Sequence, residues 1–485
     1  MKIELGAGRH IDIRFGLMNY GPVDHASPLA PKEIRVGVVG TNETVEGICG
    51  WLERCREEIP AKPSEQPNLF PKFPGFQPDS GFQSILVLDS QLQRETSPRV
   101  FAELKKSRHV NRALRAAVDL FCSECQYLVE KGSPQVLICA VPAELLELAG
   151  IWDTEILKEE GETEEGEETQ EASDEVADEA AVDFHHLLKA RTMRLRVPIQ
   201  LVIPSTYRGE RPRFRRPDTK EIRRLQDEAT RAWNFHTALY YKAKGVPWRL
   251  PRRAEEYTTC YVGVSFYQLL DRSALLTSVA QIFNERGEGV VVRGGQAKVA
   301  KEDRQPHLDA EAAHRLLTDS LTRYREEHRS FPARVVLHKS SGHTSQEIEG
   351  FLGAARELRV ELIDLLSLRH STTRLFRTGL YAPLRGTVLS LDARSHILYT
   401  RGSVDFFRTY PGLYVPMPLL FTCDSTDQTP RYLAHEILLL TKMNWNNTQF
   451  DGGDPITMHA ARHVGGILKY VEKDDPMEAS YRFYM

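Results

Sequence analysis

Long apolar runs, secretory features and paired cysteines are all missing from this sequence. No stretch approaches eighteen uncharged apolar residues, and the N-terminal MKIELGAGRH has no apolar core, so we expect neither a membrane span nor a secretory signal. The seven cysteines are odd in number and scattered, which predicts reduced thiols in a cytoplasmic protein. Cys122 and Cys125 form a C-x-x-C with no second pair, and zinc is the alternative interpretation there.

The motifs of several enzyme classes are missing too. The sequence contains no G-x-x-x-x-G-K-[ST] phosphate loop, no G-x-S-x-G elbow around Ser265 and no H-E-x-x-H. These absences exclude the P-loop nucleotide hydrolases, the α/β-hydrolases with that elbow and the zinc proteases with that helix motif.

Acidic residues are concentrated in one segment, and the rest of the chain is basic. Residues 155–183 contain 14 acidic residues and one lysine, which leaves 53 acidic and 62 basic residues elsewhere. A like-charged run with few apolar residues has too little surface to bury, so we predict a disordered insertion here. The basic remainder suits a polyanionic partner.

The first half of the chain alternates strand and helix patterns. Apolar, β-rich runs cover 34–40, 84–89, 135–141 and 198–204, and helix patterns cover 43–58, 110–131 and Asp218 to about Lys242. The proline-rich interval 60–82 is expected to be a long surface connection. The alternation predicts an α/β fold with a doubly wound parallel sheet, which binds ligands at the carboxyl ends of its strands.

Beyond residue 250, three strand patterns follow one another before any helix. They cover 258–270, 275–285 and 289–295, and the pair Gly294-Gly295 is expected to form a turn. A helix from Leu308 to about His328, a strand at 333–339, a helix from Ser345 to about Leu358 and a strand at 360–366 follow. This order is typical of an RNase H-like fold. His338 and His343 are expected to face solvent.

Four residues of the first half suit a terminal phosphate. His185 and Lys189 are four apart in a helix pattern and so share one face. Gln200 lies on the next strand, and Lys242 lies near the end of the helix that follows. Lysine, histidine and glutamine donors together can bind a phosphate group. Each of the four taken singly is instead explained as a solvated surface residue.

A basic stretch with interleaved aromatic residues runs from 207 to 224. Cationic side chains next to aromatic rings suit a nucleic-acid backbone with stacked bases, and a solvated loop is the alternative. The arginines that we assign to backbone contacts are Arg208, Arg211, Arg213, Arg215 and Arg216.

Three stretches resemble prokaryotic Argonaute proteins. Residues 437–471 are similar to the end of their PIWI domain, 229–250 to the junction of their MID and PIWI domains, and YVGVSFYQ (261–268) to their first PIWI strand. The resemblance implies a lead-in segment (1–32), a Rossmann-like MID domain (33–250) and an RNase H-like PIWI domain (251–485). The chain is too short to hold the family's N and PAZ domains as well, so it resembles a short prokaryotic Argonaute.

The resemblance also gives the four phosphate candidates a role. In the family, residues at the positions of His185, Lys189, Gln200 and Lys242 hold the 5′ phosphate of a guide strand. Many prokaryotic members bind Mg²⁺ there through the C-terminal carboxylate, which in this chain is that of Met485, and Gln200 is the second ligand that we expect.

The positions that hold the catalytic metals in target-cutting relatives carry other residues here. Ser265, Ser340 and Arg462 stand where the resemblance implies acidic or histidine ligands, and Glu285 or Glu288 lies near the place of a further glutamate. Two hydroxyls and a guanidinium supply no negative charge for a hard dication. We therefore expect no catalysis. The rival interpretation is a nuclease whose metals are bound by Asp451, Asp454 and a glutamate, although the turn composition of FDGGDP explains both aspartates without catalysis.

The short Argonautes imply a two-component system. We expect a guide RNA, a single-stranded DNA target and a heterodimer with an APAZ-containing effector protein, with a higher oligomer on activation as the alternative. The effector domain would be a TIR or sirtuin-like NADase, or a DREN nuclease, switched on by target binding in prokaryotic defence. A nucleic-acid-binding protein without an effector is the third interpretation.

Overall fold

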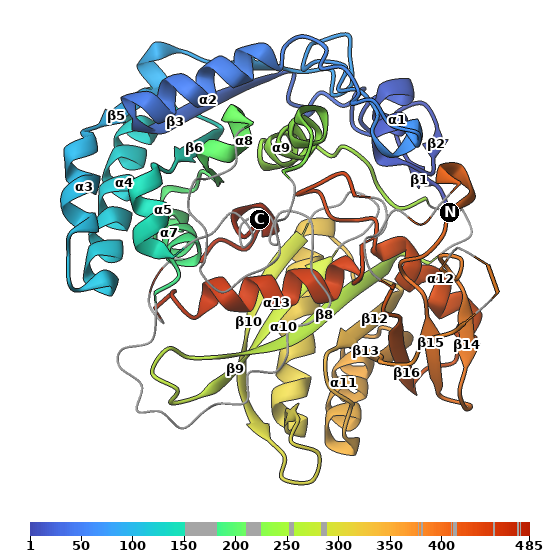
Figure 1. Ribbon diagram of the computed structural model, residues 1–485. Helices are drawn as coiled ribbons and strands as arrows, with labels where there is room; N and C mark the ends of the chain where they lie inside the picture. Colours follow the sequence, from blue (N-terminus) through green and yellow to red (C-terminus); the bar gives the residue numbers. More distant parts are fainter. Residues whose placement is uncertain are drawn as a thin grey trace.

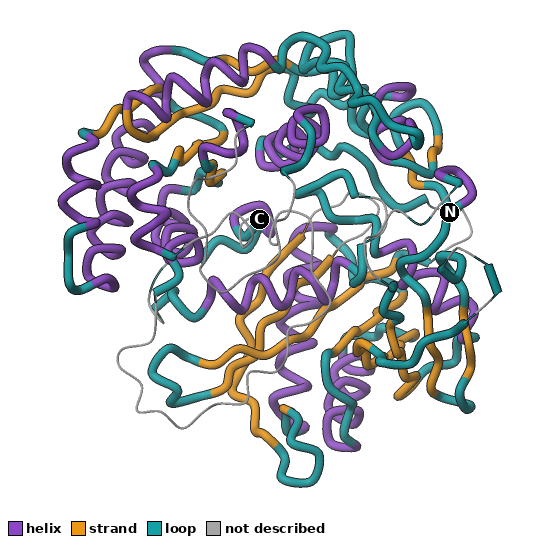
Figure 2. Tube along the Cα trace, viewed as in Figure 1, coloured by secondary structure: helices purple, strands orange, loops and turns teal. Residues whose placement is uncertain are grey.

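The computed structural model describes residues 1–150, 182–209, 225–251, 257–282, 289–376, 378–379, 382–408, 410, 415–449, 452–472, 475 and 477–485. Two sheets lie in separate lobes, with the C-terminal residue between them (Figure 1). Helices surround both sheets, and long loops run between the lobes on the side of the N-terminus (Figure 2). Within the described residues, no helix is both long and apolar enough to cross a membrane.

The first lobe contains a five-stranded, fully parallel sheet. Its path runs β4-β3-β6-β7, and β5 also pairs with β3. All five residues of β6 are buried, as expected for a strand covered on both faces. The predicted doubly wound sheet is confirmed. The strands are β3 (Glu33–Thr41), β4 (Ile85–Val87), β5 (Gln93–Thr96), β6 (Val136–Ala140) and β7 (Ile199–Val202).

Three helices of this lobe, α2, α7 and α9, begin at residues whose side chains cap them. Thr41 ends β3 and forms a capping box with Thr44 at the start of α2. Asp183 and Asp227 cap α7 and α9 by accepting backbone N–H groups. The helices are α2 (Asn42–Arg54), α3 (Pro98–Lys105), α4 (Val110–Gly132), α5 (Ala143–Ala149), α7 (Phe184–Thr192), α8 (Pro204–Arg208) and α9 (Glu228–Lys242).

The second lobe is built on a nine-stranded mixed sheet with the order β11-β10-β9-β8-β12-β13-β16-β15-β14. Strands β10, β9 and β8 form an antiparallel meander, and β12 is parallel to both β8 and β13, as the RNase H-like pattern predicts. The strands are β8 (Thr259–Gln268), β9 (Leu275–Ile282), β10 (Gly289–Val299), β11 (Pro306–His307), β12 (Arg334–Lys339), β13 (Leu362–His370), β14 (Val388–Ser390), β15 (Ser395–Leu398) and β16 (Leu419–Ser425).

Helices cover both faces of this sheet (Figure 1). The helices α10 (Ala310–His328) and α11 (Ser345–Glu357) bury apolar residues against β8, β12 and β10 in one core. On the other face, α13 (Ile456–Leu468) lies on β8 and β9, and α12 (Pro430–Leu440) packs on β15 and β16. The α13 backbone approaches closely: a Cβ added at Gly263 would lie 2.0 Å from the Thr457 carbonyl oxygen.

The N-terminal segment joins the two lobes. It contains β1 (Ile3–Glu4), β2 (Arg9–His10) and α1 (Ile13–Tyr20). Lys442, just after α12, donates to the carbonyls of Met1 (2.8 Å) and Ile11 (2.7 Å), while Arg249 exchanges backbone hydrogen bonds with Glu4. The short 3₁₀ helices are η1 (Pro67–Leu69), η2 (Ser90–Leu92), η3 (Met193–Leu195), η4 (Asp405–Phe407) and η5 (Tyr481–Phe483).

Several sequence-based predictions need correction. The helix expected from Asp218 begins at Glu228, because Asp227 is its N-cap with extended backbone; residues 210–224 lie outside the described part of the chain. Gly294 and Gly295 lie within β10, where the pairing with β9 shifts register in a bulge. The interval 60–82 is more than a surface connection, since Phe73, Phe76 and Phe82 are fully buried in it.

Candidate nucleic-acid interface

Three of the predicted phosphate ligands come from different elements of the first lobe and are buried. Lys189 on α7 is 3 % exposed, and Lys242 at the end of α9 is 1 % exposed. The Lys242 ammonium donates to Oε1 of Gln200 on β7 over 2.5 Å. The Lys189 ammonium donates to the Tyr484 carbonyl over 3.3 Å, and Met485 is buried next to it in sequence. We call Lys189, Gln200 and Lys242 the amine cluster.

Histidines adjoin the amine cluster. His185, the fourth predicted ligand, is buried on α7, and its ring stacks on that of His186 at 5.7 Å between centroids. His186 packs against His463 of α13 at 5.6 Å, and His463 Nε2 lies 3.4 Å from the Lys189 ammonium. His463 in turn stacks on His459, one helical turn earlier. Sequence reasoning missed these three histidines, although the i, i+4 spacing of His459 and His463 was a usable signal.

The start of α7 is fixed by an ion pair. Asp183 accepts from the backbone N–H of His186 (3.0 Å), and its other oxygen lies 2.8 Å from His186 Nδ1. Burial favours the neutral carboxyl, but the hydrogen bond and charge of His186 outweigh it and hold the pKa of Asp183 well below its usual range. The ionised aspartate therefore caps the helix that carries His185 and Lys189.

The positions of the expected missing metal ligands are gathered at the second sheet. Ser265 lies buried in the middle of β8, opposite Ser278 of β9. Ser340 follows β12, and its backbone N–H donates to the Val264 carbonyl over 3.3 Å. Arg462 is on α13, which crosses this strand, and its guanidinium pairs with Asp454. We call Ser265, Ser340 and Arg462 the serine site.

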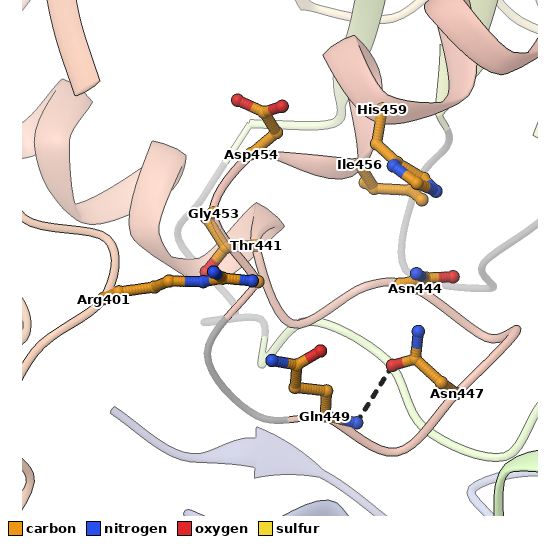
Figure 3. A pocket seen from close by; sticks show the side chains of 10 residues that line it. Arg401, Thr441, Asn444, Asn447, Gln449, Gly453, Asp454, Ile456 and His459 are labelled. Carbon is orange, nitrogen blue, oxygen red and sulfur yellow. Dashed lines mark hydrogen bonds between the residues drawn. The ribbon is translucent and has the colours of Figure 1, made fainter. Parts of the chain in front are cut away.

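Asp454 contacts a guanidinium and an imidazole. Besides Arg462, it lies 3.3 Å from Nε2 of His370 at the end of β13. Its carboxylate lies at one side of a small polar hollow, shown in Figure 3, where Gln449 donates its backbone N–H to Asn447. The hollow is lined by Arg401, Thr441, Asn444, Asn447, Gln449, Gly452, Gly453, Asp454, Ile456 and His459.

Two histidines predicted to face solvent are buried instead. Strand β12 is central in the nine-stranded sheet, so His338 has no exposed surface, and burial lowers its pKa to about 3. The side chain of His343 is also inaccessible and pairs with Asp424 (2.7 Å). The neighbouring Lys339 forms a buried ion pair with Glu347 (2.6 Å). The prediction failed because an apolar pattern does not show which strands lie in the middle of a sheet.

The structure describes the remaining candidates only in part. Arg208, at the end of α8, is exposed and pairs with Glu43 over 2.5 Å. Cys125 faces Cys139 of β6 with 3.8 Å between their sulfur atoms, rather than Cys122, and its pKa is raised by that contact and by burial. In the described part of the chain, no group of three or more His, Cys, Asp or Glu is arranged to hold a metal. Outside the described residues lie Arg211, Arg213, Arg215, Arg216, Glu285, Glu288, Asp451 and residues 155–181.

No protein-family model and no curated protein matches this chain in sequence. Solved structures do match it. Clostridium butyricum Argonaute, bound to a guide DNA and a 19-mer target DNA, superposes with a TM-score of 0.63 at 13 % identity, covering 98 % of this chain and 52 % of that one. The chain has an Argonaute-like fold.

Two further structures agree with this Argonaute-like fold. Drosophila Piwi has a TM-score of 0.55 at 12 % identity, covering 99 % of this chain and 55 % of its own. Aa-Ago with externally bound siRNA also has a TM-score of 0.55 at 12 % identity, and the match covers 97 % of this chain and 53 % of the Aa-Ago chain. The two lobes thus match the MID and PIWI architecture, and the chain spans about half the length of these structures.

Proposed function

We propose that this protein binds a guide strand by its 5′ phosphate and recognises a complementary strand through base pairing. The observation that carries the proposal is the amine cluster: two lysines and a glutamine from α7, α9 and β7 are buried, Lys242 bonds Gln200, and Lys189 bonds the Tyr484 carbonyl. Buried ammonium groups bind a phosphate dianion strongly because little water competes for them. The guide and target strands in the Clostridium butyricum Argonaute structure support this assignment.

The finer assignment follows from the resemblance to the short prokaryotic Argonautes. The guide is an RNA, the target is single-stranded DNA, and the protein forms a heterodimer with an APAZ-containing effector of the TIR, sirtuin-like or DREN type. The basic balance outside 155–183 supports a nucleic-acid partner, because phosphates are bound largely through lysine and arginine. Target binding activates the effector in a defence response.

Mg²⁺ is the cofactor that we propose beside the guide phosphate. Its preferred ligands are oxygens, and the Gln200 side chain presents one in Oε1, the atom that accepts from Lys242. The Met485 carboxylate is the second ligand of the proposal. When bound, the ion would neutralise charge on the phosphate.

We further propose that the protein binds its target without cutting it, because the serine site lacks metal ligands. Metal-dependent cleavage needs anionic oxygen ligands, whereas Ser265, Ser340 and Arg462 offer hydroxyls and a cation. The rival nuclease would use Asp451 and Asp454. The pairing of Asp454 with Arg462 and its contact with His370 argue against it, because both side chains lie against the carboxylate that the metal would need.

The test compares two RNA oligonucleotides that differ only in a 5′ phosphate or a 5′ hydroxyl. We expect at least tenfold tighter binding of the phosphorylated strand by fluorescence anisotropy, and no discrete product when a complementary DNA and Mg²⁺ are added. Equal affinity for the two strands would contradict the proposal. Sequencing co-purified nucleic acid and identifying co-purified protein test the guide and effector assignments separately.

A further inference from the structure

The two edges of the nine-stranded sheet differ in their capacity to pair with another strand. At one edge, β11 is two residues long and begins with Pro306, which has no backbone N–H. The next residue, His307, is buried between Glu347 (3.3 Å) and Asp303 (2.8 Å). This edge therefore carries two of the devices that prevent strand addition.

At the other edge, β14 directs backbone groups outward at the rim of the molecule (Figure 1). Tyr399 donates to the Thr387 carbonyl and Leu391 donates to the Ser395 carbonyl, both over 2.9 Å. Residues 387, 389 and 391 thus bond to β15, since bonded pairs alternate along an antiparallel ladder. The N–H and C=O of Val388 and Ser390 consequently face outward, and none of the described strands pairs with that side.

The side chains along this edge are apolar and exposed on both faces of the sheet. Val388 is 40 % exposed and Leu389 is 36 % exposed, and they point to opposite faces because they are adjacent in a strand. Leu391 is 52 % exposed on the same face as Leu389, and Leu384 before the strand is 47 % exposed. An added strand would cover this surface above and below the sheet plane.

The charge around the edge distinguishes between possible occupants. Arg385 precedes β14, and Arg394 follows it in the turn to β15. Arg374 is also near, because the backbone N–H of the next residue, Leu375, donates to the Tyr399 hydroxyl. Two acids lie beside these arginines in the described part of the chain: Asp392 accepts the backbone N–H groups of Arg394 and Ser395 within the turn, and Asp424 pairs with the Arg394 guanidinium (3.7 Å), so the basic side chains outnumber the acidic ones by one. A second copy of this edge would bring like charges together, whereas an acidic strand would be attracted.

We propose that the outer edge of β14 accepts an extended strand from another protein, in which apolar and acidic side chains alternate. The partner's backbone pairs with Val388 and Ser390, and its apolar side chains cover Val388, Leu389 and Leu391. The partner would be the effector chain, and this identity of the partner rests on the proposed function.

The test uses a fluorescein-labelled eight-residue peptide of alternating valine and glutamate as the probe. We expect saturable binding to the full chain by anisotropy, weakened at least tenfold by Val388→Pro, which removes one outward N–H and none of the bonds to β15. Val388→Lys should weaken binding as well, without any change of backbone. Val299→Lys, at an exposed position on β10 near the opposite edge, is the matched control and should bind as the wild type does.

The outcomes separate this inference from the proposed function. No saturable binding, or equal binding by Val388→Pro and the wild type in a folded protein, would overturn the strand-docking site. Concentration-dependent dimerisation in sedimentation that Val388→Pro abolishes would overturn it too, because the occupant would then be a second copy. The affinity for 5′-phosphorylated RNA should be the same in the wild type and in all these variants. If the wild type failed to bind this RNA, that result would count against the proposed function and not against the strand-docking site.

Discussion

The amine cluster and the serine site lie against the same helix, α13, but differ in what their side chains can bind. At the amine cluster, three elements each contribute a buried amine or amide side chain. At the serine site, the backbone of an RNase H-like sheet is present, while the one charged side chain pairs with Asp454. The comparison teaches that two sites beside one helix can offer different chemistry, with amine and amide donors at one and hydroxyls and a paired guanidinium at the other.

Replacing a lysine of the amine cluster should have the largest effect. Lys242→Met keeps the volume of a buried side chain and removes the charge, so we expect about 30-fold weaker binding of 5′-phosphorylated RNA, equivalent to about 2 kcal/mol. Lys298→Ala, at an exposed position on β10, is the control and should change affinity less than twofold. Anisotropy titrations with 5′-phosphate and 5′-hydroxyl strands provide the measurement. If both strands lose affinity equally, the lysine is not a ligand of the 5′ phosphate.

The second test concerns the scaffold of the serine site. Gly263→Ala would place a Cβ against the Thr457 carbonyl and push α13 away from β8, at a cost of about 1–3 kcal/mol in the free energy of unfolding. Gly295→Ala is the matched control, because a Cβ there meets no atom within 4 Å. Urea unfolding of the two variants gives the difference. Equal stability would mean that α13 does not depend on its contact with β8.

The third test asks whether Arg462 binds a phosphate. Arg462→Ser removes the guanidinium, and we expect about three- to tenfold weaker binding of a target strand to the guide-loaded protein, together with a smaller salt dependence. Arg315→Ser, an exposed position on α10, should leave target affinity unchanged. Unchanged affinity of Arg462→Ser would leave the arginine with a structural role beside Asp454.

The smallest effect should come from the cap of α7. The folded-state pKa of Asp183 is depressed, so its stabilisation is present above the unfolded value of about 4 and is lost as the pH falls through the folded value. The difference in unfolding free energy between wild type and Asp183→Asn should therefore be smaller at pH 3 than at pH 6. A pH-independent difference would remove the ion pair as its cause.

Sequence patterns were informative where a residue's neighbours are local or lie in a repeated motif. Apolar periodicity predicted the longer strands of the first sheet, the strands β8, β9, β10, β12 and β13, and the helices α2, α4, α10 and α11, but not β14, β15, β16 or α12. Lys242 meets Gln200 as a helix end meets the adjacent strand. Contacts between distant segments could not be predicted in this way. The approach of His463 to Lys189 spans 274 positions in sequence, and the pairing of Asp454 with Arg462 depends on how a turn folds back onto its helix. The open edge at β14 likewise became visible only from the strand order.

Helix α13 contacts elements of both sites. It packs against α7, which carries Lys189, and against β8, which carries Ser265. Its 13 residues span about 20 Å, with the polar hollow at its first turn and His463 near its middle. A substitution that displaces α13 is therefore expected to alter both the amine cluster and the serine site, so a defect in one of them does not by itself locate the change.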